Sequence, residues 1–443
     1  MPTASGPLVA VVGGGLAGLA AAARLAKMGH AVRLHEATAA LGGRWAPYAL
    51  SGTGVLVDDA PGVLTFPAPW RDLFRKSGRP LEAELAISGH ALAPATAATY
   101  RFADGTELAL PSDRGEQHEA LRHAYGPGAA ARWQHLLDSL GAVWQALRPL
   151  GLEEPYEPTA LGRDVVRRLR GRRSLGDLAD GLAEPHLRAL VRSTAFRQGT
   201  TPEQAPALAA VDLLVSRTFG RWQLRPDVGV GARHDPSDVG RTSLLVEALA
   251  ARLVLRGVDV RLGSRVLAVE AGPAGVTRVR TDAGFEPAAR VVLAVDPWSA
   301  ADLLPPAAAR DLRRTLRGAA PARLPTAVHT VLDADAAELD GAGGLDDVGE
   351  LVRLDPDGLP VVATTRRLSG RAVRTVLDHR TTTPRPGSGL TTAGFRGWRR
   401  RPGTSTALPG VALAGAASPA GNSASVVVQS GALAAYAVAG RRD

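Results

Sequence analysis

The stretch Leu-Val-Ala-Val-Val-Gly-Gly-Gly-Leu-Ala-Gly, residues 8–18, decides the fold. Its first five residues form a continuous apolar run, which is typical of a β-strand covered on both faces. Gly13, Gly15 and Gly18 stand at GxGxxG spacing. In a dinucleotide-binding turn the first glycine permits the tight turn, the second lets the backbone approach a pyrophosphate, and the third lets the helix pack against the strand. The stretch therefore predicts a strand, a glycine turn and a helix around a dinucleotide.

The residues after this turn complete a βαβ unit. Residues 19–28 predict a helix that Gly29 ends, and residues 31–34 predict a second strand that leads to Glu36. The free N–H groups and the positive dipole at the start of the helix favour phosphate groups. A carboxylate 18 residues after Gly18 accepts hydrogen bonds from the adenosine ribose and repels a 2′-phosphate, which argues against NADP. The complete unit favours a bound dinucleotide over a glycine turn without a ligand.

A second group of glycines follows the acidic residue. Gly42-Gly43-Arg44-Trp45 begins six residues after Glu36. With this spacing the chain resembles the amine oxidase and phytoene desaturase superfamily of flavoproteins. The resemblance implies FAD, with Arg44 contacting the phosphates and the two glycines allowing the backbone to pass close to the cofactor. It also implies an α/β fold class, in which a Rossmann-like FAD-binding domain of the GR2 type carries an inserted α+β substrate domain.

The resemblance continues in the middle and at the C-terminal end of the chain. Residues 242–255 predict an amphipathic helix, and residues 257–262, 265–270 and 290–297 predict strands. In the family, the backbone near Val266 flanks the adenine. At the C-terminal end, a turn and strand over 408–417 precede a loop and a helix over 425–439, and in the family this helix points its N-terminus at the flavin. The resemblance thus implies cofactor contacts from Gly13, Gly14, Gly15, Leu16, Ala17, Gly18, Glu36, Ala37, Gly42, Gly43, Arg44, Trp45, Val266, Gly415, Ala416, Asn422, Ser423 and Ala424.

The same segments imply two discontinuous domains. Residues 1–60, 240–300 and 395–443 are expected to form the FAD-binding domain. Residues 61–239 and 301–394 are expected to form the substrate-binding domain. The strands of the FAD-binding sheet then come from distant parts of the chain.

The composition excludes several kinds of site. The chain has no cysteine, which rules out a disulfide framework, a zinc–thiolate site, an iron–sulfur cluster and a cysteinyl-linked cofactor, and we predict no metal site. Its only lysines are Lys27 and Lys76, and neither belongs to a GxxxxGK phosphate loop. The net charge of +9 comes with an excess of arginine and without a nucleic-acid-binding motif. We therefore interpret the charge as a solvated arginine-rich surface and expect no nucleic-acid partner.

The two lysines also bear on the reaction. In the amine oxidases of this superfamily a lysine commonly holds a water at the flavin, and an aromatic cage receives the amine. Both lysines lie in the first 76 residues, and Phe395 and Trp398, which could form half a cage, stand among arginines. We therefore favour a phytoene desaturase-like oxidoreductase that removes a hydride from a C–H bond of an apolar isoprenoid, polyene-like or secondary-metabolite substrate. A flavin amine or amino-acid oxidase is one alternative, and a non-catalytic prenyl-binding protein similar to the Rab GDP dissociation inhibitors is another.

The catalytic residues stay unassigned, because hydride transfer to a flavin requires no strong protein base. Candidate polar groups for the active site are Asp58, Asp59, Arg221, Trp222, His234 and His329. No basic residue precedes the apolar stretch at residues 8–23, so we predict no secretory signal and a cytoplasmic location. Peripheral membrane contact, for example through the six arginines within residues 162–173, and the oligomeric state are left open.

Overall fold

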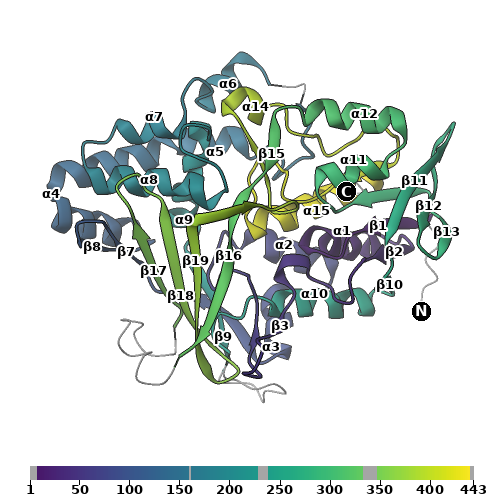
Figure 1. The fold of residues 1–443 in the computed structure, drawn as a ribbon, viewed down its shortest axis with the longest axis horizontal. Coiled ribbons are helices and arrows are strands. Elements are labelled where there is room, and N and C mark those ends of the chain that lie inside the picture. Colours follow the sequence, from purple (N-terminus) through teal and green to yellow (C-terminus); the bar gives the residue numbers. More distant parts are fainter. Residues whose placement is uncertain (1–6, 159–160, 228–237, 333–346, 440–443) are drawn as a thin grey trace.

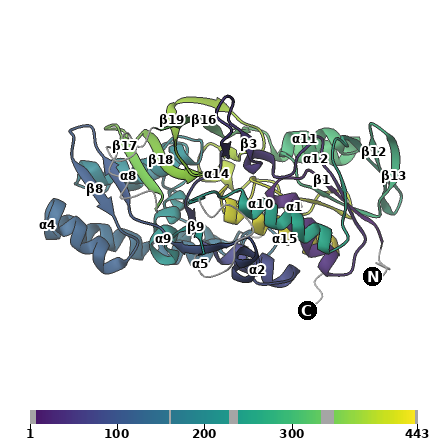
Figure 2. The same ribbon diagram turned by 90° about the horizontal axis from the view of Figure 1, so that it is seen from below.

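A computed structural model describes residues 7–158, 161–227, 238–332 and 347–439. Figure 1 shows two sheets in different halves of the molecule, with the C-terminal helix α15 (Ala424–Ala439) between them. One half is built on a parallel sheet and the other on a larger, mostly antiparallel sheet. Figure 2 shows the same two halves from below, with β17 and β18 at one end and β12 and β13 at the other.

The parallel sheet carries the predicted dinucleotide fold. Its strand order is β10-β2-β1-β14-β21, and the strands are β1 (Val9–Val12), β2 (Val32–His35), β10 (Asp259–Arg261), β14 (Arg290–Leu293) and β21 (Val411–Leu413). All neighbours in it pair in parallel. The strands predicted from the glycine motif, from residues 257–262 and 290–297, and from the C-terminal turn are thus confirmed as one sheet.

Both faces of this sheet are covered, as the continuous apolar run predicted. Because side chains alternate along a strand, Val9 and Val11 point into one core and Ala10 and Val12 into another. The first core holds α1 (Leu16–Lys27), α2 (Ala68–Ser77), α3 (Leu81–Ile87), α10 (Leu244–Leu255) and α15. The second core holds the sheet β11 (Val266–Gly272), β12 (Gly275–Thr281) and β13 (Gly284–Pro287), together with α11 (Pro297–Leu303) and α12 (Pro306–Thr315).

The other half is a six-stranded sheet packed against helices. Its order is β16-β19-β18-β17-β7-β8, with strands β7 (Ala98–Arg101), β8 (Glu107–Leu110), β16 (Arg323–Val331), β17 (Gly349–Leu354), β18 (Pro360–Leu368) and β19 (Arg371–Pro384). The covering helices are α4 (Arg114–Ser139), α5 (Gly141–Leu147), α6 (Arg163–Arg168), α7 (Leu175–Asp180), α8 (Pro185–Arg197), α9 (Val211–Phe219) and α14 (Gly394–Trp398). The remaining elements are β3 (Tyr48–Ala49), β4 (Leu56–Val57), β5 (Leu64–Thr65), β6 (His90–Pro94), β9 (Arg221–Pro226), β15 (Ala319–Pro321), β20 (Leu390–Thr392) and the short 3-10 helices η1 (Gly43–Trp45) and η3 (Ala207–Ala210).

Several helices pack outside the domains that their sequence positions suggest, including α3 beside α2 and, in the opposite direction, α14 in the helical core of the other half. Trp70, Leu73 and Phe74 of α2 are buried in the core of the parallel sheet, so that core reaches beyond the predicted boundary at residue 60. Ala308 and Leu312 of α12 are buried with β11 and β12, although residues 301–394 were assigned to the substrate domain. The apolar faces of these helices need a core to cover them, and the sequence motifs end before either helix. The division into two domains stays a prediction, with α2, α3 and α12 on the cofactor side and α14 on the other side.

Within the described ranges, each helix is too short or too polar to span a bilayer. Of the six arginines in residues 162–173, Arg170 is turned inward and donates to the Ser139 hydroxyl at 2.7 Å.

Candidate cofactor and substrate site

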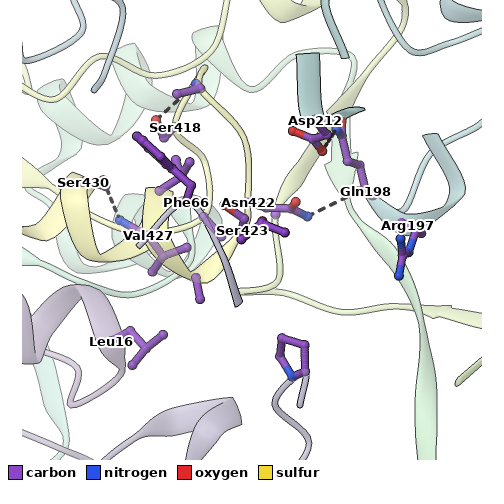
Figure 3. A pocket seen from close by; sticks show the side chains of 18 of the residues that line it. Leu16, Phe66, Arg197, Gln198, Asp212, Ser418, Asn422, Ser423, Val427 and Ser430 are labelled. Carbon is purple, nitrogen blue, oxygen red and sulfur yellow. Dashed lines mark hydrogen bonds between the residues drawn. The ribbon is translucent and has the colours of Figure 1, made fainter. Parts of the chain in front are cut away.

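A cavity of about 630 Å³ lies where the two halves of the molecule meet. One wall consists of the glycine turn after β1, the start of α1, η1 and the loop before α15. The other wall consists of residues from α8, α9, β7, β9 and β17. Figure 3 shows Leu16 on the first wall and Arg197 on the opposite side. The cavity therefore joins a cofactor region to a region in which a substrate can lie.

The glycines of the first motif have different structural roles. Gly13 has a φ of +103°, and a Cβ there would lie 2.6 Å from the Ala294 carbonyl oxygen. A Cβ on Gly18 would lie 1.8 Å from the Gly13 carbonyl oxygen. A Cβ on Gly15 would meet nothing within 4 Å, and Gly15 lines the cavity. Gly13 and Gly18 thus close the turn, whereas Gly15 leaves space for a ligand beside the start of α1.

Glu36 is held at the carboxyl end of β2 with room for further hydrogen bonds. Its Oε2 accepts from the Gly14 backbone N–H at 2.7 Å, and its Oε1 accepts from the Thr38 backbone N–H at 2.8 Å. A carboxylate offers about four lone-pair sites, so both oxygens can accept a ribose hydroxyl as well. Glu36 is buried and lines the cavity. This arrangement fits the ribose role that the sequence predicted.

Arg44 provides positive charge in the cofactor region. Gly42, with a φ of +112°, pairs with Gly15 in an isolated bridge and brings η1 beside the first glycine turn. Desolvation by the surrounding protein, and then the charge of Arg385, lower the pKa of Arg44, while Asp59 acts in the opposite direction. Among the described residues neither arginine has an ion-pair partner within 4 Å. An anionic pyrophosphate would supply the missing counter-charge.

The C-terminal loop completes the first wall. After β21 the Gly415 N–H donates to the Ser430 hydroxyl of α15 at 3.1 Å, which fixes the loop on the helix. Asn422 donates to the Ser388 carbonyl at 3.0 Å and to the Gln198 carbonyl at 3.4 Å. The loop therefore connects the cofactor region to α8 and to the chain before β20.

Most of the predicted cofactor residues meet at this cavity. Those that line it are Gly13, Gly15, Leu16, Ala17, Glu36, Gly42, Gly43, Arg44, Trp45, Gly415, Ala416, Asn422, Ser423 and Ala424. The other four, Gly14, Gly18, Ala37 and Val266, lie outside its lining. Gly14 and Gly18 act through the turn, as described above. Their contacts with a cofactor stay predictions.

Val266 and Ala37 lie near Glu36 without facing the cavity. The Val266 side chain is buried in the core between β11 and α11, although the Ser264 N–H donates to the Glu36 carbonyl at 2.9 Å. The backbone before Val266 therefore runs beside Glu36, the residue expected to bind the ribose. Ala37 is exposed next to it.

The substrate side of the cavity combines an apolar wall with a charged cluster. Phe66 contacts Trp144 edge to face with 5.4 Å between ring centroids, and it contacts Phe219 at 4.8 Å. Phe66 has a φ of +56°, which is unusual for a side chain of this size. The Ser425 hydroxyl donates to the neighbouring Thr65 carbonyl at 3.1 Å and ties this turn to α15. On the opposite side, Arg197 and Arg221 share the carboxylate of Glu350.

Of the polar candidates, Arg221 alone lines the cavity among those that the structure describes. Asp58 is fully buried and pairs with Arg366 at 2.8 Å. Asp59 accepts from Tyr48 at 2.8 Å and contacts His329 at 3.2 Å; these partners lower the pKa of Asp59. The indole N–H of Trp222 donates to the Phe219 carbonyl at 2.6 Å, and His234 lies outside the described residues.

The aromatic pair considered as half of an amine cage has a packing role. Phe395 and Trp398 stack with 5.2 Å between centroids, and both are buried in the helical core. The Trp398 indole donates to the Pro419 carbonyl at 3.0 Å. Neither side chain lines the main cavity.

Sequence reasoning missed four residues of the substrate side and one on the cofactor side. They are Arg197, Gln198, Asp212, Glu350 and Arg385. No motif contains them, because they come from separate elements and meet only in the folded chain. Which of many arginines and carboxylates line the cavity cannot be recognised without the fold.

The residues present fit FAD as a non-covalently bound cofactor. Gly15 and the start of α1 would receive the pyrophosphate, Glu36 the ribose, and Arg44 the phosphate charge. The loop over residues 422–424 would lie against the flavin, as the resemblance implies.

Comparison with known proteins identifies a family of flavoproteins that matches this chain. A family model described as flavin-containing amine oxidoreductase matches residues 16–359. A phytoene dehydrogenase from Streptomyces griseus is 30% identical over 303 residues, which span 67% of this chain and 56% of that protein. A hydroxyneurosporene desaturase from Cereibacter sphaeroides is 28% identical over 303 residues, which span 66% of this chain and 56% of that protein. The chain thus spans little more than half the length of these relatives.

Solved structures agree on the fold. A putrescine oxidase with bound putrescine has a TM-score of 0.65 and 16% identity, covering 98% of this chain and 99% of that one. A cyclohexylamine oxidase from Brevibacterium oxydans has a TM-score of 0.60 and 17% identity, covering 98% of each chain. The family match includes the start of α1, Glu36 and Arg44, the residues that fit the cofactor. The chain belongs to the flavin-containing amine oxidoreductase family, and its cofactor is FAD.

Proposed function

We propose that this flavin oxidoreductase removes a hydride from a C–H bond of a substrate with an apolar, polyene-like body. The observation that carries the proposal is the wall of the cavity opposite the charged cluster, where Phe66 and Trp144 stand beside the cofactor region. Two relatives are named a phytoene dehydrogenase and a hydroxyneurosporene desaturase, which supports a substrate of this kind.

The bound flavin supplies the hydride acceptor, and the chain supplies orientation and a dry pocket. Phe66 is fixed by its turn and by its contacts with Trp144 and Phe219, so it presents a rigid apolar surface to a substrate. Leu213 and Val215 of α9 extend this apolar lining. A conjugated chain gains dispersion contacts and loses little hydration energy against such a surface.

The positions of the lysines also support a desaturase-like reaction. Lys76 pairs with Asp72 at 3.1 Å on α2, and Lys27 is the last residue of α1. Neither lysine lines the cavity. An amine oxidase mechanism that depends on a lysine at the flavin therefore has no residue to use here.

A second candidate function is oxidation of an amine. It is favoured by the fold shared with the putrescine and cyclohexylamine oxidases, and by two carboxyl groups on the substrate side of the cavity, those of Asp212 and Glu350. Glu350 is already shared by two arginines, which leaves Asp212 as the group that could receive an ammonium ion.

Anaerobic reduction of the bound flavin separates these functions. The purified holoprotein is mixed with polyenes, amines and amino acids in turn, and bleaching of the flavin absorbance is followed. We expect bleaching by polyenes and none by amines. Bleaching by amines alone contradicts the proposal and supports the amine alternative.

A further inference from the structure

We infer that the substrate carries a carboxylate, which the guanidinium of Arg197 binds at the wall of the cavity opposite the cofactor region. This inference rests on the proposed function, since it names a group of the substrate for the same cavity. Arg197 is the last residue of α8, lines the cavity, and lies across from Leu16 in Figure 3. Its side chain is 39% exposed, and since the residue lines the cavity, this open surface is available to a ligand there.

Two arginines share one carboxylate at this wall. Arg197 Nη2 lies 3.0 Å from Glu350 Oε1, and Arg221 Nη2 lies 3.1 Å from Glu350 Oε2. Burial by itself raises the pKa of Glu350, but Arg221 and Arg197 together hold that pKa at about 2. Glu350 is therefore ionised, and the three side chains carry one positive charge in excess.

Three neighbouring titratable groups, Tyr100, His379 and Asp212, interact with this cluster. Burial raises the pKa of Tyr100, and burial together with Arg197 lowers the pKa of His379 to about 4, so both are neutral near pH 7. Burial also raises the pKa of Asp212, which accepts a hydrogen bond from Gln198 at 2.7 Å. The charge of Arg197 acts in the opposite direction on Asp212, but no ion pair within 4 Å joins these two described side chains, so Asp212 does not occupy the donors of Arg197.

The hydrogen bonds of Arg197 leave several donors free. A guanidinium has five N–H groups. Within the part of the chain that the structure describes, the hydrogen-bond partners of Arg197 are Glu350 and Tyr100, which together use fewer than five N–H groups. Arg221 differs, because it also donates to the Thr96 carbonyl at 3.2 Å and is only 9% exposed. Arg221 is therefore the structural partner of Glu350, and Arg197 is the one available to a ligand.

A carboxylate is the group that matches these donors. The planar fork of arginine binds carboxylates through two parallel hydrogen bonds. A pure hydrocarbon in the cavity would exclude water from the guanidinium and leave its donors unpaired, which is unfavourable. An acid with an apolar body satisfies both the charged cluster and the wall around Phe66.

The test uses octanoate, octanamide and octylammonium as probes of the holoprotein, with binding followed by perturbation of the flavin spectrum and by calorimetry. We expect octanoate to bind at least about tenfold more tightly than octanamide, since a charge-assisted hydrogen bond is lost in the amide. In Arg197→Gln this preference should disappear, and in Arg197→Lys it should be kept in part. The matched control is Arg192→Gln on the same helix, whose guanidinium pairs with Asp180 and Glu203 and does not line the cavity; its preference should equal that of the wild type.

Several results would overturn the inference. If the wild-type protein binds octanoate no more tightly than octanamide, this observation alone overturns the inference, without any variant. An unchanged preference in a flavin-loaded Arg197→Gln protein, or tighter binding of octylammonium than of octanoate, has the same consequence, and the latter favours the amine alternative. The binding test needs no turnover. If polyenes fail to bleach the flavin, the proposed function fails, but the preference for octanoate can still be measured and judged separately.

Discussion

At the scale of single residues, the glycines of the first motif make different predictions. Gly15→Ala should fold normally, because its Cβ enters open space, but it should retain much less FAD, because that space borders the cofactor region. Gly18→Ala should fold poorly, because its Cβ would lie 1.8 Å from a carbonyl oxygen of the turn. Flavin content per protein and thermal unfolding measure the two effects separately. Full flavin retention by Gly15→Ala would contradict the assignment of this space to the cofactor.

The same residues show what the sequence can predict. Gly13, Gly18 and Glu36 are specified by local spacing, since a turn and its following helix form within one stretch of chain, and the structure places them as expected. Arg197 and Glu350 are separated by 153 positions and meet only when α8 packs against β17. Their pairing depends on tertiary packing, so no pattern in the sequence indicates it. Val266 is intermediate, because its strand was predicted while its buried orientation was not.

At the scale of elements, the contact between α1 and α15 positions the cofactor wall. A Cβ on Gly431 would lie 2.1 Å from the Ala17 carbonyl oxygen, so the two helices can approach only because residue 431 has no side chain. Ala17 lines the cavity at the start of α1. We therefore expect Gly431→Ala to lower both the midpoint of thermal unfolding and the FAD content. Gly141→Ala at the start of α5 is the matched control, since its Cβ meets nothing within 4 Å, and it should change neither. Equal behaviour of the two variants would show that the contact between α1 and α15 determines neither the thermal stability nor the FAD content.

The element boundaries were predicted less accurately than the elements. The helix expected over 19–28 is α1 from Leu16 to Lys27, because the glycine turn ends sooner than the apolar spacing suggests. The helices α2 and α12 belong to the cores beside the parallel sheet, and no motif in their sequences connects them to it. An amphipathic pattern predicts that one face of a helix is buried, but it does not indicate which core buries that face.

At the scale of the whole molecule, a buried ion pair links the two halves around the cavity. Asp58 follows β4 and Arg366 lies on β18; their side chains are 0% and 1% exposed, and their atoms are 2.8 Å apart. Asp58 also accepts from the Ser243 N–H at 3.0 Å, just before α10. The pair thus joins β18 of the six-stranded sheet to a helix of the parallel sheet.

Removing one partner of this buried pair should therefore lower the free energy of unfolding more than removing one partner of a surface pair. For Asp58→Asn we expect a loss of about 3–5 kcal/mol in the free energy of unfolding, because a buried guanidinium is left without its counter-charge. Asp58→Leu combined with Arg366→Met should recover part of that loss, since no unpaired charge remains, although the Ser243 N–H loses its acceptor. Glu107→Gln is the control: its pair with Arg101 has both side chains close to half exposed, so the loss should stay below about 1 kcal/mol. Urea denaturation of the holoproteins measures all three variants. A double variant as unstable as Asp58→Asn would show that the loss comes from the missing hydrogen bonds and packing of the pair rather than from an unpaired buried charge.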